Sequence, residues 1–326
     1  MSITQDSQAI LLLCSYLGIY ASSEVKPLNL RQWNSLARRL QDLSMRPGDL
    51  LGLSVAEIQE KLSVSADEAH RYSGLLARSG ILAIELERLN SSGIQVLTRA
   101  DDDYPAKYRE RLKESAPSVL FFAGEKALLG QPGIAVVGSS NLNETGAEAA
   151  EFVGNTCGVS GLVLYSGGAR GVDTISMRAA LQVRGTSVGV IADSLEKAIR
   201  DPENRFAIQR GDLCLVTPYS PNTPFSIGNA MGRNKLIYTL ADYALIVASD
   251  VGKGGTWAGA TEALKAKWLP VFVLKHELMP EGNNKLLENG GLAFPYPPPV
   301  DPMILKDWLK EEAGKIKPKA EQLSFF

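Results

Sequence analysis

Short, continuous apolar runs alternate with longer helical patterns across the middle of the chain. Such runs are typical of strands that are buried on both faces. Strands separated by helices favour a parallel sheet with right-handed crossovers. The pattern therefore predicts an α/β fold with a doubly wound, mostly parallel sheet, whose strands lie near residues 134–138, 162–166, 187–191, 213–217, 243–247 and 271–274.

The first 93 residues show a different pattern, with apolar positions at helical spacing. Ser54 and Ser65 are each followed three residues later by glutamate, which predicts two capping boxes. Gly80 and Gly93 are predicted to end helices. Residues 1–93 are therefore expected to form a small all-helical domain of the SAM or helix-hairpin-helix type. An interaction module and a direct contact with DNA both remain open for it.

Three further segments complete the expected organisation. Residues 94–131 bridge the helical and α/β parts, with strands at 94–97 and 119–122. The α/β domain covers residues 132–293. Residues 294–326 begin with a proline-rich linker at 294–302, continue through a short helical turn at 304–309 and end in a charged tail.

Composition narrows the classes of function. The net charge of −2 and the pI near 5.9 exclude a basic coat for nucleic acid but allow a local basic patch. The three cysteines are far apart and the two histidines have no ligand partner nearby, so neither a metal nor another cofactor is expected. No apolar run approaches the roughly 20 residues that span a bilayer. We expect a cytoplasmic protein without a membrane partner.

The first candidate site follows the first strand of the α/β domain. Gly138, Ser139 and Ser140 stand where small residues let the backbone approach a ligand. The segment lacks the G-x-G-x-x-G fingerprint, and no acidic residue is placed to hold a ribose after the second strand. A dehydrogenase that uses a nicotinamide cofactor is therefore disfavoured.

The second candidate site follows the second strand, where the sequence reads SGGARGVD. Consecutive backbone N–H groups there can form an anion-binding nest, with the guanidinium of Arg170 as a bidentate phosphate ligand. The alternative is a tight strand-to-helix turn with Asp173 as a local cap. The candidate phosphate-binding residues of this segment are Ser166, Gly167, Gly168, Arg170 and Gly171.

The third candidate site combines two glycine-containing segments, residues 228–237 and 252–262. Arg233 and Lys235 are expected to open a helix, and Lys253 lies in a glycine-rich loop. Together with Arg170 these cations would form one basic crevice at the carboxyl edge of the sheet. Asn234, Gly255 and Thr256 complete the candidate set.

In their order, these motifs resemble the DprA/Smf family of DNA-processing proteins. The matching segments are IAVVGS, SGGARGVD, GRNKLI, GGTWAGATEAL and the preceding DDDYPAKYRERL with PSVLFFAG. The resemblance covers residues 94–274 and implies a Rossmann-like domain that binds single-stranded DNA, forms a homodimer and assists a RecA-type recombinase. It places Ser139, Arg170, Arg233 and Lys235 in the DNA pocket, with Gly138, Gly167, Gly168 and Gly171 in its floor.

Some positions depart from the family pattern. Ser140 replaces an expected arginine, Met177 a histidine, and Thr217-Pro218 a Ser-Glu pair. These changes indicate a divergent member, acting in transformation, recombination, mobile-element biology or defence. The GGT run also resembles the related SLOG superfamily, so a nucleotide sensor or nucleotide hydrolase is the alternative function. Asp173 and Glu262 would then be the acid/base candidates; the main hypothesis assigns no catalytic residue.

The chain ends in a pentapeptide that is similar to bacterial sliding-clamp binding peptides. Its candidate contact residues are Gln322, Leu323, Phe325 and Phe326. A polar glutamine with spaced apolar anchors suits a hydrophobic groove on a partner. A terminal apolar segment that packs on its own chain is the alternative.

Overall fold

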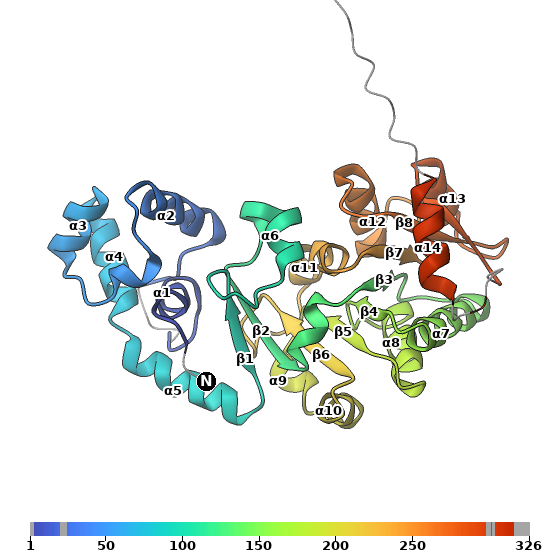
Figure 1. Cartoon of the computed structure of the whole chain (residues 1–326), viewed down its shortest axis with the longest axis horizontal. Helices are drawn as coiled ribbons and strands as arrows, with labels where there is room; N and C mark the ends of the chain where they lie inside the picture. The colour runs from blue at the N-terminus through green and yellow to red at the C-terminus, as the bar shows by residue number, and fades with distance from the viewer. Residues whose placement is uncertain (1–2, 20–24, 298–300, 302–303, 316–326) are drawn as a thin grey trace, which may run out of the picture. The chain divides into compact units, whose positions relative to one another are not determined.

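The computed structural model describes residues 3–19, 25–297, 301 and 304–315 (Figure 1). The chain divides into two compact units. The sequence predicts a linear division after residues 93, 131 and 293, whereas each unit combines segments that are distant in the sequence. The first unit comprises residues 1–126, 191–209 and 214–226, and the second comprises 127–190, 210–213 and 227–326.

The strands form a nine-stranded sheet in the order β1-β2-β6-β5-β4-β3-β7-β8-β9. The predicted α/β fold with a mostly parallel sheet is confirmed. From β3 the chain proceeds outward through β4 and β5, and it later resumes at β7 on the other side of β3. The switch point between β3 and β7 is where such sheets bind ligands. The parallel strands of the second unit are β3 (Gly133–Val137), β4 (Val163–Ser166), β5 (Ser187–Val190), β7 (Tyr243–Ile246), β8 (Val271–Lys275) and β9 (Leu292–Pro295).

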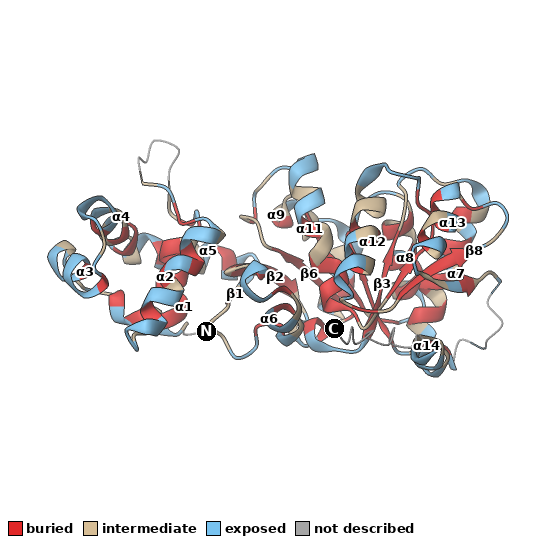
Figure 2. Cartoon of the chain, turned by 90° about the horizontal axis from the view of Figure 1, so that it is seen from above, coloured by how far each residue is buried: buried red, intermediate tan, exposed pale blue. Residues whose placement is uncertain are grey.

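Two layers of helices cover this parallel sheet. Helix α7 packs on α8, and α11 packs on α12, while α8 and α11 both contact β3, β4 and β5. All five residues of β3 are buried, which explains its uninterrupted apolar run (Figure 2). The helices of this unit are α7 (Glu144–Val159), α8 (Val172–Gln182), α11 (Ile227–Leu240), α12 (Gly254–Ala266), α13 (Glu281–Glu288) and α14 (Leu305–Gly314).

The N-terminal part of the first unit is helical, as predicted. Both capping boxes are present: the Glu57 carboxylate accepts from the Ser54 N–H at 2.8 Å, and the Glu68 carboxylate accepts from the Ser65 N–H at 3.2 Å. The helices are α1 (Gln5–Cys14), α2 (Leu30–Asp42), the 3-10 turn η1 (Pro47–Leu50), α3 (Val55–Leu62), α4 (Ala66–Leu76) and α5 (Ser79–Ser91).

The remainder of the first unit is built around antiparallel strands. The predicted bridge strands are present as β1 (Gln95–Thr98) and β2 (Val119–Gly124), which pair with each other. Strand β2 also pairs antiparallel with β6 (Leu213–Thr217). The accompanying helices and 3-10 turns are α6 (Ala106–Leu112), η2 (Lys113–Ser115), η3 (Lys126–Gly130, in the second unit from Ala127), α9 (Leu195–Ala198) and α10 (Pro202–Gln209).

Three local predictions differ from the structure. Gly80 lies in the first turn of α5 and ends no helix, whereas Gly93 follows α5 with the expected positive φ of 80°. The start of the predicted linker belongs to β9, because Phe294 is buried and packs edge-to-face on Trp308. The predicted turn at 304–309 extends into α14, anchored by buried Leu305 and Leu309. The terminal pentapeptide lies outside the described residues.

Within the described ranges, no helix is both long and apolar enough to cross a membrane. The same ranges contain no group of three or more His, Cys, Asp or Glu side chains that could hold a metal ion.

Candidate nucleic-acid interface

Three strand-end turns of the second unit meet at the switch point. The N–H of Ser139, after β3, donates to the carbonyl of Ala248, after β7, at 2.8 Å. The N–H of Val172, at the start of α8, donates to the carbonyl of Ser139 at 3.3 Å. The structure therefore brings together the turns that the sequence predicts to form one crevice.

Two glycines allow this close approach. A Cβ on Gly138 would lie 2.3 Å from Cγ2 of Val172. Gly171 has φ +90°, and a Cβ there would lie 2.4 Å from the carbonyl oxygen of Ser139. No other residue fits at either position without moving backbone or a packed side chain.

The predicted anion-binding nest after β4 holds the chain's own carboxylate. Oδ2 of Asp173 accepts from the N–H groups of Gly167 at 3.1 Å and Ala169 at 3.4 Å. The N–H of Gly138 also interacts with this carboxylate. Asp173 is only 5% exposed. The structure thus supports the alternative interpretation, in which Asp173 closes a tight turn, and these amides are not available to a phosphate.

Arg233 requires a correction. Neither it nor Lys235 opens a helix, because both lie in the middle of α11. Only 4% of Arg233 is exposed. Its Nη1 donates to the carbonyl of Val190 at the end of β5. Burial raises the pKa of Asp173 to about 6, and the positive charge of Arg233 opposes that rise. Arg233 therefore stabilises the interior beneath the crevice and does not line it.

Two other polar residues also belong to this interior. The hydroxyl of Ser166 is fully buried and donates to the carbonyl of Val136 at 2.7 Å, so this predicted ligand is turned into the sheet. Tyr238 is buried on α11, and burial raises its pKa, with further contributions from the charges of Asp173 and Glu262. No sequence motif marks Tyr238, because its burial near Asp173 depends on the packing of α11 against the sheet.

The turn after β7 is organised differently. Lys253 is the N-cap residue of α12, makes no side-chain cap hydrogen bond and is exposed, and the first turn of α12 contains no acidic residue. Nδ2 of Asn234 donates to the carbonyl of Gly255 at 3.0 Å, which ties α11 to the start of α12. The helix N-terminus therefore offers a positive dipole end without an internal carboxylate.

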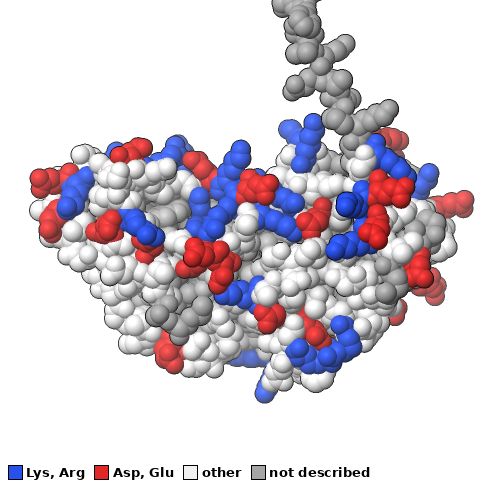
Figure 3. Space-filling model, viewed as in Figure 1, with Lys and Arg blue, Asp and Glu red and all other residues white. Residues whose placement is uncertain are grey.

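The remaining predicted residues differ in exposure. Arg170 is exposed, and among the described residues none pairs with its side chain or with that of Lys253. Ser140 and Gly168 are also exposed, while Lys235 and Thr256 are partly buried. On the face shown in Figure 3, basic and acidic side chains are interspersed.

A doubly wound sheet with exposed cations at its switch point defines a Rossmann-like domain suited to phosphate groups. Residues 95–297 match the family model described as DNA recombination-mediator protein A. The match covers more than half of the sequence, and the chain belongs to this family. The predicted family resemblance is confirmed.

Curated relatives place the chain in the same group. It is 31% identical to DNA processing protein DprA of Streptococcus pneumoniae over 159 residues, which are 47% of this chain and 54% of the relative. It is 30% identical to protein Smf of Escherichia coli over 141 residues, which are 42% of this chain and 37% of the relative. The chain thus spans about half the length, or less, of these relatives.

Solved structures show the same fold. The X-ray structure of DprA from Streptococcus pneumoniae superimposes with a TM-score of 0.67 at 21% identity, covering 90% of this chain and 95% of that one. DNA processing protein A from Helicobacter pylori, whose single-stranded DNA binding mode has been described structurally, matches with a TM-score of 0.54 at 26% identity. That match covers 68% of this chain and 99% of the other.

Proposed function

We propose that this chain binds the sugar-phosphate backbone of single-stranded DNA at the β3–β7 switch point. The observation that carries the proposal is the exposed guanidinium of Arg170, which no described residue pairs with. It lies on a turn in which Asp173 already accepts the N–H groups of Gly167 and Ala169. The open N-terminus of α12 with Lys253 follows β7, which is separated from β4 by β3 in the sheet. Backbone binding through such contacts is independent of base sequence and weakens with salt.

The DNA-binding role of the Helicobacter pylori relative supports this proposal. We infer that the protein acts without catalysis, in the cytoplasm, as a homodimer that delivers single-stranded DNA to a RecA-type recombinase. The process it serves is recombination, transformation, mobile-element transfer or defence. A sliding clamp that takes the peptide Gln322–Phe326 remains a further proposed partner.

The test measures binding of a fluorescent oligo(dT) to the full chain over a range of salt concentrations. We expect Arg170→Ala to weaken binding roughly tenfold, because a charge-assisted phosphate contact is lost. The slope of log affinity against log salt should become shallower by about 0.7 for each phosphate contact removed. Lys253→Ala should act in the same direction.

Lys265→Ala is the matched control, since it removes an exposed lysine from the other end of α12. It should leave affinity and salt slope unchanged. Binding that does not depend on salt, or equal losses in Lys265→Ala and Arg170→Ala, would contradict the proposal.

A nucleotide sensor or hydrolase is the less supported alternative. Of its two acid/base candidates, Asp173 is buried and accepts hydrogen bonds from the turn, while Glu262 is exposed on α12. Thermal stabilisation by a nucleotide that disappears in Glu262→Gln would favour this alternative over DNA binding.

A further inference from the structure

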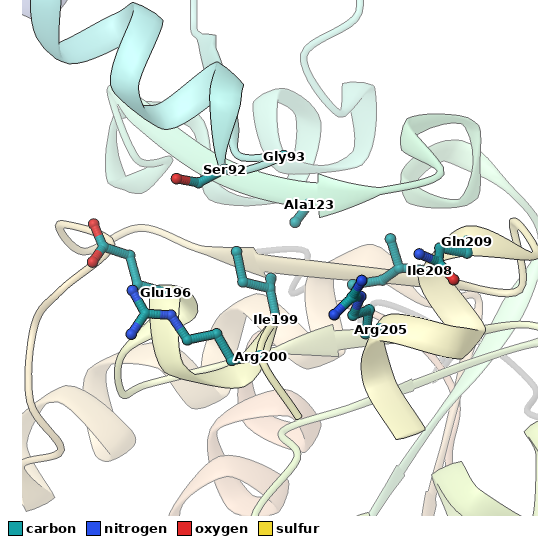
Figure 4. A pocket seen from close by; sticks show the side chains of 9 residues that line it. All are labelled: Ser92, Gly93, Ala123, Glu196, Ile199, Arg200, Arg205, Ile208 and Gln209. Carbon is teal, nitrogen blue, oxygen red and sulfur yellow. The ribbon is translucent and has the colours of Figure 1, made fainter. Parts of the chain in front are cut away.

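A cavity of about 440 Å³ lies within the first unit and shares no residue with the switch-point crevice (Figure 4). One wall is the segment that carries α9 and α10, and the other is β2 with the turn before β1. Its volume falls in the range of about 300–1,000 Å³ typical of small-molecule sites. No motif of the sequence indicates it, because its walls come from three separate segments.

The interior of the cavity is apolar. In Figure 4 the side chains of Ile199 and Ile208 point across the space toward Ala123 on β2. Both isoleucines are partly exposed, whereas Ala123 is buried. Aliphatic groups arranged in this way offer a surface to the flat face of an aromatic ring.

Two arginines supply the charge at the cavity. Arg200 and Arg205 line it from α9–α10, both are exposed, and no described residue pairs with either side chain. Three acidic residues stand close to these arginines in the sequence, Glu196, Asp201 and Glu203, and none of the three is without an interaction. Glu196 pairs with Arg88 at 2.9 Å, and Asp201 accepts the N–H groups that begin α10 at 3.0 and 3.1 Å. The guanidinium groups of Arg200 and Arg205 therefore remain open to an external anion.

We propose that this cavity binds a nucleotide, with the base against Ile199 and Ile208 and the phosphate between Arg200 and Arg205. Guanidinium groups suit phosphate because they donate in a planar, bidentate geometry. Either a free nucleotide or one nucleotide of a single strand supplies this chemistry. The proposal does not depend on DNA binding at the switch point.

The experiment follows the Ile199 and Ile208 methyl signals of the full chain by NMR, assigned through Ile199→Val and Ile208→Val. The probes are dTMP, dAMP, inorganic phosphate and oligo(dT). We expect a nucleotide or the oligonucleotide to shift both methyl signals, and Arg200→Ala/Arg205→Ala to weaken that binding roughly tenfold or more. Arg31→Ala/Lys197→Ala is the matched control, because it removes two exposed cations of the same unit outside the cavity.

The arms separate the two sources of ligand. Shifts with dTMP or dAMP identify a free nucleotide, and shifts with oligo(dT) alone identify a strand; both support the site. The proposal is overturned if neither the nucleotides nor oligo(dT) shift the methyl signals. It is also overturned if inorganic phosphate alone reproduces the shifts and the affinity, or if the two double variants bind equally well. Retention of these shifts in Arg170→Ala would keep the result separate from the switch-point proposal.

Discussion

Two turns of the second unit are both rich in glycine, but only one of them has an acidic residue in the first turn of the helix that follows. The turn between β4 and α8 has Asp173 in the first turn of its helix, and that carboxylate accepts the turn's own N–H groups. The turn between β7 and α12 has no acidic residue in the first helical turn, and its N-cap is Lys253. The first turn is closed by an internal anion, and the second is left for an external one.

This difference changes how glycine-rich turns should be interpreted. Glycines give a backbone that can surround an anion, but an acidic residue of the same turn competes for that place at high effective concentration. In the β4–α8 turn, Arg170 is the exposed residue whose side chain can contact a phosphate. Phosphate binding there depends on a side chain, whereas the β7–α12 turn also offers the dipole of its helix.

The largest effect should come from removing the internal anion. Asp173→Ala leaves buried amides without an acceptor and Arg233 without its counter-charge, so we expect the free energy of unfolding in urea to fall by about 3–5 kcal/mol. Asp173→Asn keeps an acceptor oxygen and should cost less. Glu262→Gln, at an exposed position, should change stability by less than about 0.5 kcal/mol. Equal stability of Asp173→Ala and the wild type would show that the turn is not held by this carboxylate.

The second largest effect should be a pH dependence of stability that comes from Asp173 in the β4–α8 turn. Burial raises the pKa of Asp173 from 3.8 to about 6, so the folded chain holds this proton more tightly than the unfolded chain does. Stability should therefore fall as pH rises from about 4 to about 6, by about 3 kcal/mol in total from this group. Urea unfolding of wild type and Asp173→Asn across this range should give curves that diverge. Parallel curves would contradict the burial of an ionisable carboxyl group.

A smaller effect should separate the glycines of the two turns. A Cβ on Gly167 would lie 1.9 Å from Nη1 of Arg233, which is buried and bonded to the sheet, so Gly167→Ala should cost about 1–3 kcal/mol. A Cβ on Gly255 would lie 2.6 Å from Nδ2 of Asn234, the end of a partly exposed side chain that can turn away at the loss of one hydrogen bond. We expect Gly255→Ala to cost less than about 1 kcal/mol by thermal denaturation. A larger loss at Gly255 would reverse the comparison.

Much of the fold could be predicted because it depends on local patterns. Buried strands such as β3 and β7 read as short apolar runs, and the serine caps of α3 and α4 are set by residues three positions apart. The convergence of the turns follows from the parallel sheet, since strands that run the same way end at the same edge. The compact units could not be predicted, because residues 191–226 divide between them by contacts that no linear pattern records.

The sequence by itself determined which residue types stand at the ends of the strands, and that was enough to indicate a phosphate-binding edge and the family. Only the tertiary structure decided which of those residues face a ligand. Arg233 and Ser166 have the right chemistry but point into the core, because one face of α11 and one face of β4 pack inward. Asp173 accepts the amides of its own turn, and the approach of the β3 turn adds the N–H of Gly138 and helps to bury it. Arg170 stays exposed, and no described residue pairs with its side chain.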